Sequence, residues 1–241
     1  MFLSYFESRL PADFDNFTEM LKKLEFCEKL GIKNVILEPI NKLKVIPLEI
    51  KKKIKSNTTL NVFFRINLRL NNLEDFKKRI KQYNNCSDIL SIESLNKEVQ
   101  LQAARDSRVD IISFSNLQII KTLTPGVISL TKQNNSFLEF SLASIMITNK
   151  ANQSKNFRNL YRFIQLALKY KANCIISGNF DDLYDLRHPR ALISICNSLL
   201  GISLDRAKKI FIVNPILLLE RTEKHHSNKL EPEVRLIKGG D

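Results

Sequence analysis

Histidine is scarce in the 241 residues of this sequence, and its scarcity limits the metal chemistry available to the chain. Three histidines occur, and two of them, His225 and His226, lie close to the C-terminal end. A metal-dependent phosphoesterase on a barrel normally carries several inward-facing histidines. Three aspartates stand between 181 and 185, near His188, but no partner motif accompanies them. We therefore expect no metal site.

Cysteine is also sparse, and its four copies lie far apart, at positions 27, 86, 174 and 196. No C-x-x-C pair occurs, which argues against a zinc site and against a disulfide scaffold. Cys27 falls on the apolar side of a helical pattern and Cys174 in a strand-like run, so buried thiols and a reducing compartment are expected. No apolar run reaches the roughly 18 residues of a membrane span, and no signal-like segment opens the chain. We expect a cytoplasmic protein with no membrane partner.

Glycine and proline are few, with 6 and 7 copies, which excludes a disordered or collagen-like chain. No Ser-His-Asp or Cys-His arrangement, Gly-rich phosphate loop or nucleotide fingerprint is visible, so no catalytic residue is predicted. Hydrophobic residues make up 44% of the chain, enough for a packed core. The length suits one domain, because α/β barrels of about 200 to 250 residues fold as a unit.

Basic residues, by contrast, are abundant. Lysine and arginine number 38 against 25 acidic residues, which leaves a formal net charge of +13. From residue 221 onward there are five basic and four acidic residues, so nearly all of the surplus lies before the C-terminal segment. A surplus of this size favours a polyanionic partner. The alternative is that a sequence rich in lysine, asparagine and isoleucine reflects an AT-rich coding bias.

Short apolar runs alternate with longer amphipathic stretches, which predicts repeated βα units. Strands are expected at residues 2–5, 34–38, 60–70, 88–93, 109–113, 136–140 and 174–177. Helices are expected from about 13 to 30 and at 47–55, 73–83, 97–108, 156–170, 189–200 and 216–220, the last opened by Asn214-Pro215. About seven strands favour a TIM-barrel-like (β/α) barrel over a doubly wound sheet. We expect one domain over 1–221 and a flexible tail over 222–241.

The strand at 60–70 carries two arginines on one face. A period of two places Arg65 and Arg69 together, opposite the apolar side chains of the strand. If the apolar side meets the helices, both arginines point into the barrel and toward its C-terminal mouth, where barrel sites are built. This predicts an anion site. The alternative is that Arg69 pairs with Glu38 or Glu93, which also end strands.

A polar loop over 177–190 follows a strand and precedes a helix, which places it at the same mouth. Its basic side chains suit phosphate, because a guanidinium can donate two hydrogen bonds to one oxyanion. Arg158 and Arg162, four residues apart on a helix, fit either the same role or a solvated charged face. The predicted nucleic-acid contacts are therefore Arg65, Arg69, Arg105, Arg108, Lys132, Arg158, Arg162, Arg187, His188 and Arg190.

Four stretches of the sequence resemble one protein family in the same order along the chain. They are residues 105–113, 156–160, 176–190 and 207–217, and the ending 231–237 is similar as well. The most specific combination is a strand ending in Ser177-Gly178 followed by Asp185-Leu186-Arg187-His188-Pro189-Arg190. On these residues the sequence resembles the archaeal ribonuclease P protein component 3, which is related to the eukaryotic 30-kilodalton subunit. It departs from that pattern at Phe114, where the family often has histidine, and at Ile176, where a serine is usual.

The resemblance implies a barrel related to the polymerase and histidinol phosphatase domain that has lost its metal cluster. It implies a subunit that binds the catalytic RNA of ribonuclease P and supports removal of the 5′ leader from precursor tRNA. The chain alone would not be catalytic and would bind no cofactor, since the RNA holds the Mg²⁺. The implied partners are the ribonuclease P RNA, protein component 2 in a heterotetramer, the other protein subunits, and precursor tRNA.

Two alternatives remain at this point. One is an independent metal-dependent phosphoesterase on the same barrel. The other is a scaffold that pairs with component 2 and touches RNA little. Metal analysis with a phosphatase assay tests the first alternative, and RNA crosslinking with and without the partner tests the second.

Overall fold

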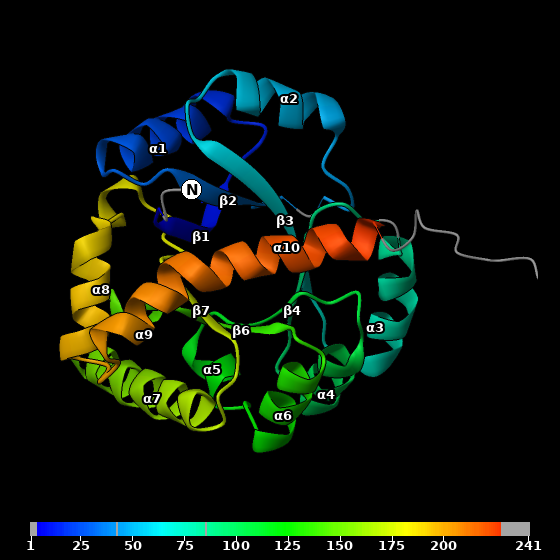
Figure 1. Cartoon of the computed structure of the whole chain (residues 1–241), viewed down its shortest axis with the longest axis vertical. Coiled ribbons are helices and arrows are strands. Elements are labelled where there is room, and N and C mark those ends of the chain that lie inside the picture. The colour runs from blue at the N-terminus through cyan, green and yellow to red at the C-terminus, as the bar shows by residue number, and fades with distance from the viewer. Residues whose placement is uncertain (1–3, 42, 85, 228–241) are drawn as a thin grey trace, which may run out of the picture.

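The computed structural model describes residues 4–41, 43–84 and 86–227, and seven parallel strands wind around one axis inside a ring of helices (Figure 1). The strands pair in chain order, each parallel to the next. They are β1 (Phe6–Ala12), β2 (Asn34–Pro39), β3 (Asn61–Arg69), β4 (Ile89–Glu93), β5 (Ile111–Phe114), β6 (Phe137–Ser141) and β7 (Cys174–Ser177). β7 lies beside β1, so the barrel is nearly closed. The predicted TIM-barrel-like fold is confirmed.

Helices surround the strands, and each helix that directly follows a strand begins at the end of the barrel where that strand finishes. They are α1 (Phe17–Lys29), α2 (Leu48–Ser56), α3 (Leu73–Ile80), α4 (Lys97–Arg105), α5 (Leu117–Ile120), α6 (Pro125–Gln133), α7 (Lys150–Lys169), α8 (Pro189–Ser198), α9 (Leu204–Lys208) and α10 (Asn214–Ser227). Asparagine side chains accept backbone N–H groups at the starts of five of them, as Asn16, Asn72, Asn96, Asn116 and Asn149. Such caps fix where each strand-to-helix loop ends.

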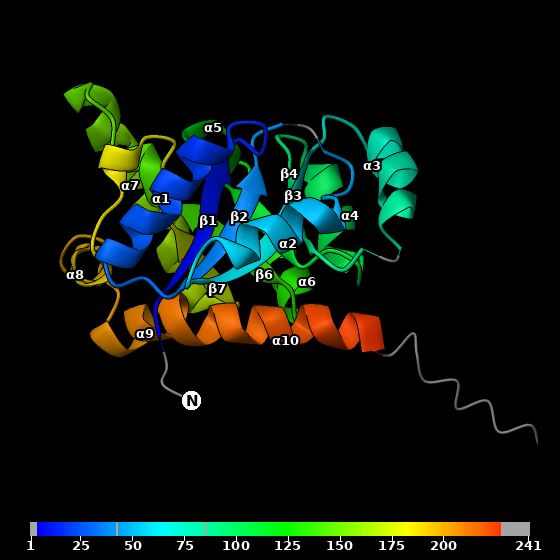
Figure 2. The same ribbon diagram turned by 90° about the horizontal axis from the view of Figure 1, so that it is seen from above.

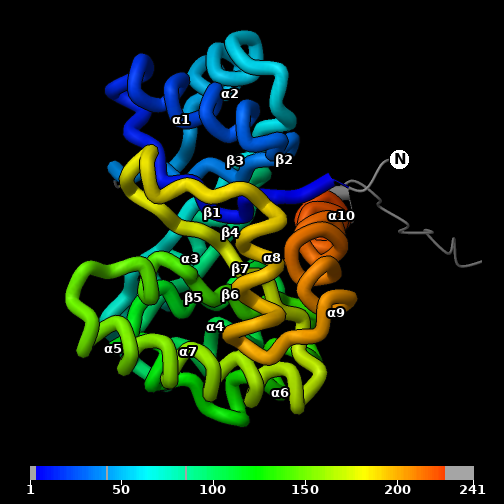
Figure 3. Tube along the Cα trace, turned by 90° about the vertical axis from the view of Figure 1, so that its left-hand side faces the viewer, coloured from blue at the N-terminus to red at the C-terminus, as the bar shows by residue number. Residues whose placement is uncertain are grey.

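Helix α10 closes one end of the barrel. It crosses the amino ends of the strands, while α5 lies at the opposite end (Figures 2 and 3). Its Leu218 is fully buried in a small apolar layer made by one side chain from each of five strands, namely Ile36, Ile89, Ile111, Phe137 and Ile175. The larger apolar core fills the space between strands and helices. The carboxyl ends of the strands form the barrel mouth. Among the described helices, none is both long and apolar enough to cross a membrane.

The first strand differs from its prediction. The sequence pattern placed it at 2–5, but β1 runs from Phe6 to Ala12. Every residue of β1 is buried. Glu7 and Arg9 can be buried because charged and polar groups inside the barrel pair with them. Charged residues in a short stretch argue against a buried strand when their distant partners are unknown.

Several helices also differ from their predictions. α5, α6 and α9 were not predicted, and α7 begins at Lys150 rather than 156 because Asn149 caps it. α4 ends at Arg105, since Asp106 leaves helical geometry. α10 does begin at Asn214, but this residue has helical backbone geometry and is not a helix cap. A π-helical turn, Lys209–Val213, leads directly into α10, and the Asn214 side chain donates instead to the Cys174 carbonyl at 2.5 Å.

The predicted tail began at residue 222, but residues 222–227 continue α10. Thr222 is buried, and its hydroxyl donates to the Leu218 carbonyl one turn earlier. The rest of the predicted tail, 228–241, lies outside the described residues.

Candidate nucleic-acid interface

The interior of the barrel holds a network of buried charges. Arg65 is fully buried on β3, and its two terminal nitrogens lie 2.7 and 2.9 Å from the carboxylate oxygens of Glu139 on β6. The Arg65 Nε lies 3.0 Å from Glu38 Oε2 on β2. Arg9 on β1 donates to Glu38 at 2.7 Å and to Glu93 at 3.3 Å. Two arginines therefore join strands from opposite sides of the barrel.

The charges in this network are nearly balanced. Burial alone would raise the pKa of Glu139, but the positive charges of Arg65 and Arg9 together have the larger effect and lower that pKa to about 2. Arg9 lies 3.6 Å from Glu139 and 1% of its side chain is exposed, so its charge is shielded from solvent. A buried ion pair of this kind holds its two side chains in one arrangement, and neither side chain is accessible to an external ligand.

The structure leaves Arg65, one of the predicted RNA contacts, no exposed surface for RNA. The inward direction deduced from the alternation of β3 is confirmed, but the guanidinium is enclosed by glutamates and does not reach the mouth. Arg69, four residues further along the strand, does reach it. Its side chain is 71% exposed and its Nε lies 3.7 Å from Glu93 Oε1, so it is only loosely paired.

Glu7 joins the two ends of the sheet, where β7 meets β1. Its Oε1 accepts the backbone N–H of Gly178 at 2.9 Å. A Cβ on residue 178 would stand 2.7 Å from Glu7 Oε2 and 2.7 Å from the Phe180 ring, which explains the glycine. Burial raises the pKa of Glu7 to about 7, although hydrogen bonds from the Gly178 and Arg9 amides oppose the shift.

This raised pKa predicts that Glu7 makes stability depend on pH. The folded state holds a proton that the unfolded state has released above pH 4.5, so stability falls as pH rises from about 4.5 to 7. Between pH 5 and pH 8 the free energy of unfolding of the unaltered chain should therefore fall by roughly 2 kcal/mol because of Glu7. Glu7→Gln keeps an oxygen that accepts the Gly178 N–H but cannot titrate, so we expect this fall to be absent in the variant. Urea denaturation at both pH values measures it. An unchanged pH dependence in the variant would contradict the assignment.

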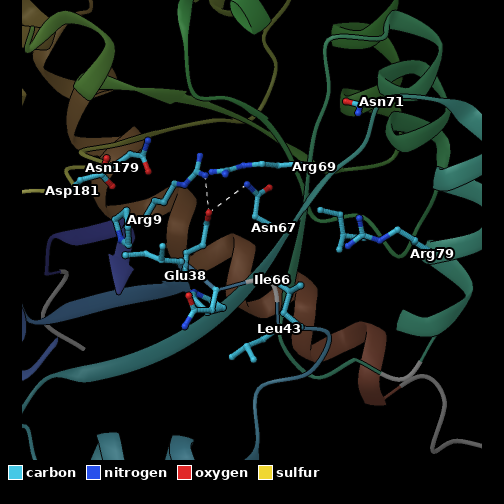
Figure 4. Close-up of a pocket in the computed structure, with 15 residues that line it drawn as sticks. Arg9, Glu38, Leu43, Ile66, Asn67, Arg69, Asn71, Arg79, Asn179 and Asp181 are labelled. Atoms are coloured by element: carbon cyan, nitrogen blue, oxygen red, sulfur yellow. Dashed lines mark hydrogen bonds and ion pairs between the residues drawn. The ribbon is translucent and has the colours of Figure 1, made fainter. Parts of the chain in front are cut away.

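A cavity of about 700 Å³ lies at the barrel mouth, above the charged network (Figure 4). Arg9 and Glu38 lie at its floor, joined to each other as the figure shows. Arg69 projects into it from the end of β3, and Arg79 faces it from α3. Asn179 lies on the side opposite Arg79. The polar part of the lining is mainly arginine and asparagine, a composition that suits an anionic and hydrogen-bonding ligand.

The loop between β7 and α8 contributes the other predicted contacts at the mouth. Arg187 is half-buried, and its guanidinium donates to the Tyr184 and Leu186 carbonyls, so it orders the loop. His188 caps α8, because its Nδ1 accepts the backbone N–H of Arg190 at 3.1 Å. The side chains of His188 and Arg190 are exposed. Their contact with nucleic acid stays a prediction.

The remaining predicted contacts do not gather at the mouth. Arg105, Arg108 and Lys132 lie toward the amino ends of the strands, at the ends of helices or in the loops that follow. Arg108 is paired with Asp106 at 2.6 Å, whereas Arg105 and Lys132 are exposed. Arg158 and Arg162 are exposed on α7, on the outside of the barrel. The ten predicted residues thus form no single cluster, and only Arg69 and those in the 177–190 segment approach the mouth.

Sequence reasoning missed two important arginines. Arg9 was hidden in an unpredicted strand. Arg221 on α10 donates to Asp110 at 2.7 Å and to carbonyls of the neighbouring loops, those of Ser107, Val109, Asn134 and Asn135. The sequence holds one signal for Arg221, namely Asp110 at the start of an apolar strand. A carboxylate that is buried there needs a cation as its partner.

The described residues contain no group of three histidine, cysteine, aspartate or glutamate side chains placed to hold a metal ion. The three aspartates near His188 do not form such a group. Asp182 instead accepts the backbone N–H of Tyr184 at 2.8 Å. The four cysteines are unpaired thiols, and burial raises the pKa of Cys174 and of Cys196 to about 12.

Comparison with known proteins identifies relatives of the whole barrel. The family model described as RNase P subunit p30 matches residues 5–227, which includes every described strand and helix. A ribonuclease P protein component 3 of Methanococcus maripaludis (strain C5) is 24% identical over 144 residues, which are 59% of this chain and 62% of the relative. The chain thus spans about three fifths of that relative's length.

Solved structures share the fold at low sequence identity. A chain in a cryo-EM structure of archaeal ribonuclease P with mature tRNA has a TM-score of 0.74 and 15% identity, covering 98% of this chain and 99% of that chain. The A. niger ochratoxinase has a TM-score of 0.61 and 9% identity, covering 90% of this chain and 71% of the enzyme. At such identities these likenesses concern the barrel alone.

Proposed function

The chain belongs to the ribonuclease P subunit p30 family, and on that premise we propose that it is a protein subunit of ribonuclease P. In this role it binds the RNA of the ribonucleoprotein and supports removal of the 5′ leader from precursor tRNA. The observation that carries the proposal is the family match over residues 5–227, which spans the whole described barrel.

Charge and geometry support an RNA-binding role. The net charge of +13 favours a polyanion. Helices that follow the strands present their amino ends toward the mouth, and these ends carry partial positive charge. Arg69, Arg79 and Arg190 lie at this end of the barrel. The positive groups at the mouth suit phosphate contacts that position RNA.

The chemistry of cleavage is proposed to belong to the RNA, which binds the catalytic Mg²⁺. The described residues offer no ligand group for a metal, and we assign none of them a catalytic role. Protein component 2, in a heterotetramer, and the other protein subunits are the proposed protein partners. Nothing in the described residues favours the independent phosphoesterase or the scaffold that touches RNA little.

Reconstitution tests this function directly. The chain is combined with ribonuclease P RNA and the candidate partner subunits, and cleavage of precursor tRNA is followed at low Mg²⁺. Cleavage that requires the chain supports the proposal. Equal cleavage with and without the chain, in a mixture that is otherwise active, would overturn it.

RNA binding by the chain is expected to weaken steeply with salt. The logarithm of the binding constant falls by roughly 0.7 to 0.9 for each phosphate contact and each log unit of salt. We expect Arg190→Glu to weaken binding roughly tenfold and to lower the salt slope by about one contact. Fluorescence anisotropy with labelled ribonuclease P RNA measures both quantities. Arg206→Glu, at an exposed position on α9, is the matched control; equal losses in the two variants would contradict a contact specific to Arg190.

A further inference from the structure

We propose that the mouth cavity binds a single unpaired nucleotide of the RNA. The inference deepens the proposed function and rests on it. The cavity, of about 700 Å³, falls within the range of roughly 300 to 1,000 Å³ that is usual for small-ligand sites. A base inside a duplex cannot enter such a cavity, whereas an unstacked base can be inserted into a protein pocket.

Arg69 provides the group for the phosphate. Its side chain is 71% exposed, and its one close acidic neighbour, Glu93 Oε1, lies 3.7 Å from Nε. The terminal nitrogens have no hydrogen-bond partner among the described residues and project into the cavity (Figure 4). Arg65, on the same face of the same strand, is enclosed by glutamates. Of these two arginines, Arg69 is therefore the one available to a ligand. A guanidinium in this position can donate two hydrogen bonds to one phosphate.

Two asparagines provide groups for the edge of the base. The side-chain amides of Asn71 and Asn179 have no hydrogen-bond partner in the described parts of the chain, and both residues line the cavity. Asn67, between them, donates to Glu93 at 2.9 Å and accepts from Ser91 at 2.9 Å, so it belongs to the floor. An amide offers a donor and an acceptor together, which is the pattern that a base edge requires.

The cavity lining also includes apolar side chains. Pro39, Ile40 and Leu43 are among them, and Ile40 is 55% exposed although its side chain is large and hydrophobic. A base packed here would cover that apolar surface while its edge meets the amides. A lining that combines apolar side chains with a few polar groups is typical of a small-ligand site.

The charge of the lining favours one phosphate over a run of them. Arg9, Arg69 and Arg79 face Glu38 and Asp181, which leaves a formal surplus of one positive charge. Arg9 is already paired with Glu38 at 2.7 Å. Because the surplus is small, the site is suited to one anionic group together with a neutral, hydrogen-bonding ring.

The test compares two RNAs on the full chain. Binding of a labelled single-stranded hexanucleotide and of a duplex of equal length is measured by fluorescence anisotropy at fixed salt. The variant is Asn71→Ala with Asn179→Gly, because Asn179 has a φ of +50° that glycine accepts without strain. We expect the double variant to bind the hexanucleotide about tenfold more weakly and the duplex unchanged. Asn57→Ala, an exposed asparagine at the end of α2, is the control and should change neither affinity.

The outcomes separate the inference from the function on which it rests. If the unaltered chain binds both RNAs but the double variant loses nothing, or loses equally for both, the mouth site is refuted and RNA binding stands. If the unaltered chain binds neither RNA, the proposed function itself fails. Competition by adenosine 5′-monophosphate, but not by adenosine or inorganic phosphate alone at equal concentration, is expected if the cavity reads base and phosphate together. Equal competition by inorganic phosphate would show an anion site and overturn the nucleotide assignment.

Discussion

Replacing Arg65 with methionine is expected to lower the free energy of unfolding by about 3–5 kcal/mol, because the variant breaks a buried ion pair and removes one of the two cations beside Glu139 and Glu38. Arg65 is fully buried, with Glu139 at 2.7 Å and Glu38 at 3.0 Å. The same substitution at Arg69 is the matched control, since this residue lies on the same face of β3 with 71% of its side chain exposed. An exposed pair contributes about 1 kcal/mol or less. Urea denaturation of both variants measures the difference.

The effect of Arg65→Met should also depend on pH. The pKa of Glu139 is lowered from 4.5 to about 2 in the folded protein, so its contribution to stability is present above pH 4.5 and is lost as pH falls toward 2. Removing Arg65 removes most of this contribution. The difference between the unaltered chain and the variant should therefore be largest above pH 4.5 and should narrow in acid. Equal stability of Arg65→Met and Arg69→Met at pH 7 would contradict the buried network.

Replacing Arg221 with methionine is expected to lower the free energy of unfolding by a comparable amount, about 3 kcal/mol or more. The substitution leaves Asp110 buried without its cation and removes four hydrogen bonds to loop carbonyls. These bonds hold α10 against the amino ends of β5 and β6. Lys224→Met, one turn further along α10 at an exposed position, is the control and should change stability by less than about 0.5 kcal/mol.

The deficit of Arg221→Met should likewise grow with pH, although the carboxyl group that Arg221 pairs with has a raised pKa. Burial raises the pKa of Asp110 from 3.8 to about 6, while Arg221 opposes the shift. In the unaltered chain stability falls as pH rises through this window and then levels off. Without Arg221 the pKa rises further, so the variant continues to lose stability above pH 6. Its deficit should be greater at pH 8 than at pH 5; a constant deficit would show that Asp110 is not the coupled group.

Most of the barrel could be predicted from local sequence patterns. β2, β3, β4 and β7 are short apolar or alternating runs, and α1 has the capping and period expected of a helix. β1 could not be predicted in the same way, because Glu7 and Arg9 are buried only by virtue of residues up to 171 positions away. The short helices α5 and α9 bury too few residues for a clear period.

The candidate site was predictable only in part. The alternation of β3 correctly directs Arg65 and Arg69 to the interior, but it cannot show that one of them lies deep among glutamates and the other at the mouth. That difference depends on Glu139, which is contributed by a strand 74 residues away from Arg65. Arg105 and Lys132 lie away from the mouth because each is near the C-terminal end of its helix. Local sequence locates helix ends poorly.

The position of α10 in the sequence also determines when the barrel can be completed during translation. A chain emerging from the ribosome releases all seven strands before this helix appears, since the strands end at Ser177 and α10 starts at Asn214. Until then the apolar layer at the amino ends of the strands has nothing to cover it. The barrel is therefore completed by nearly the last described part of the chain, and translation that stops before Asn214 leaves the apolar layer without Leu218 and exposed to water at the base of the sheet.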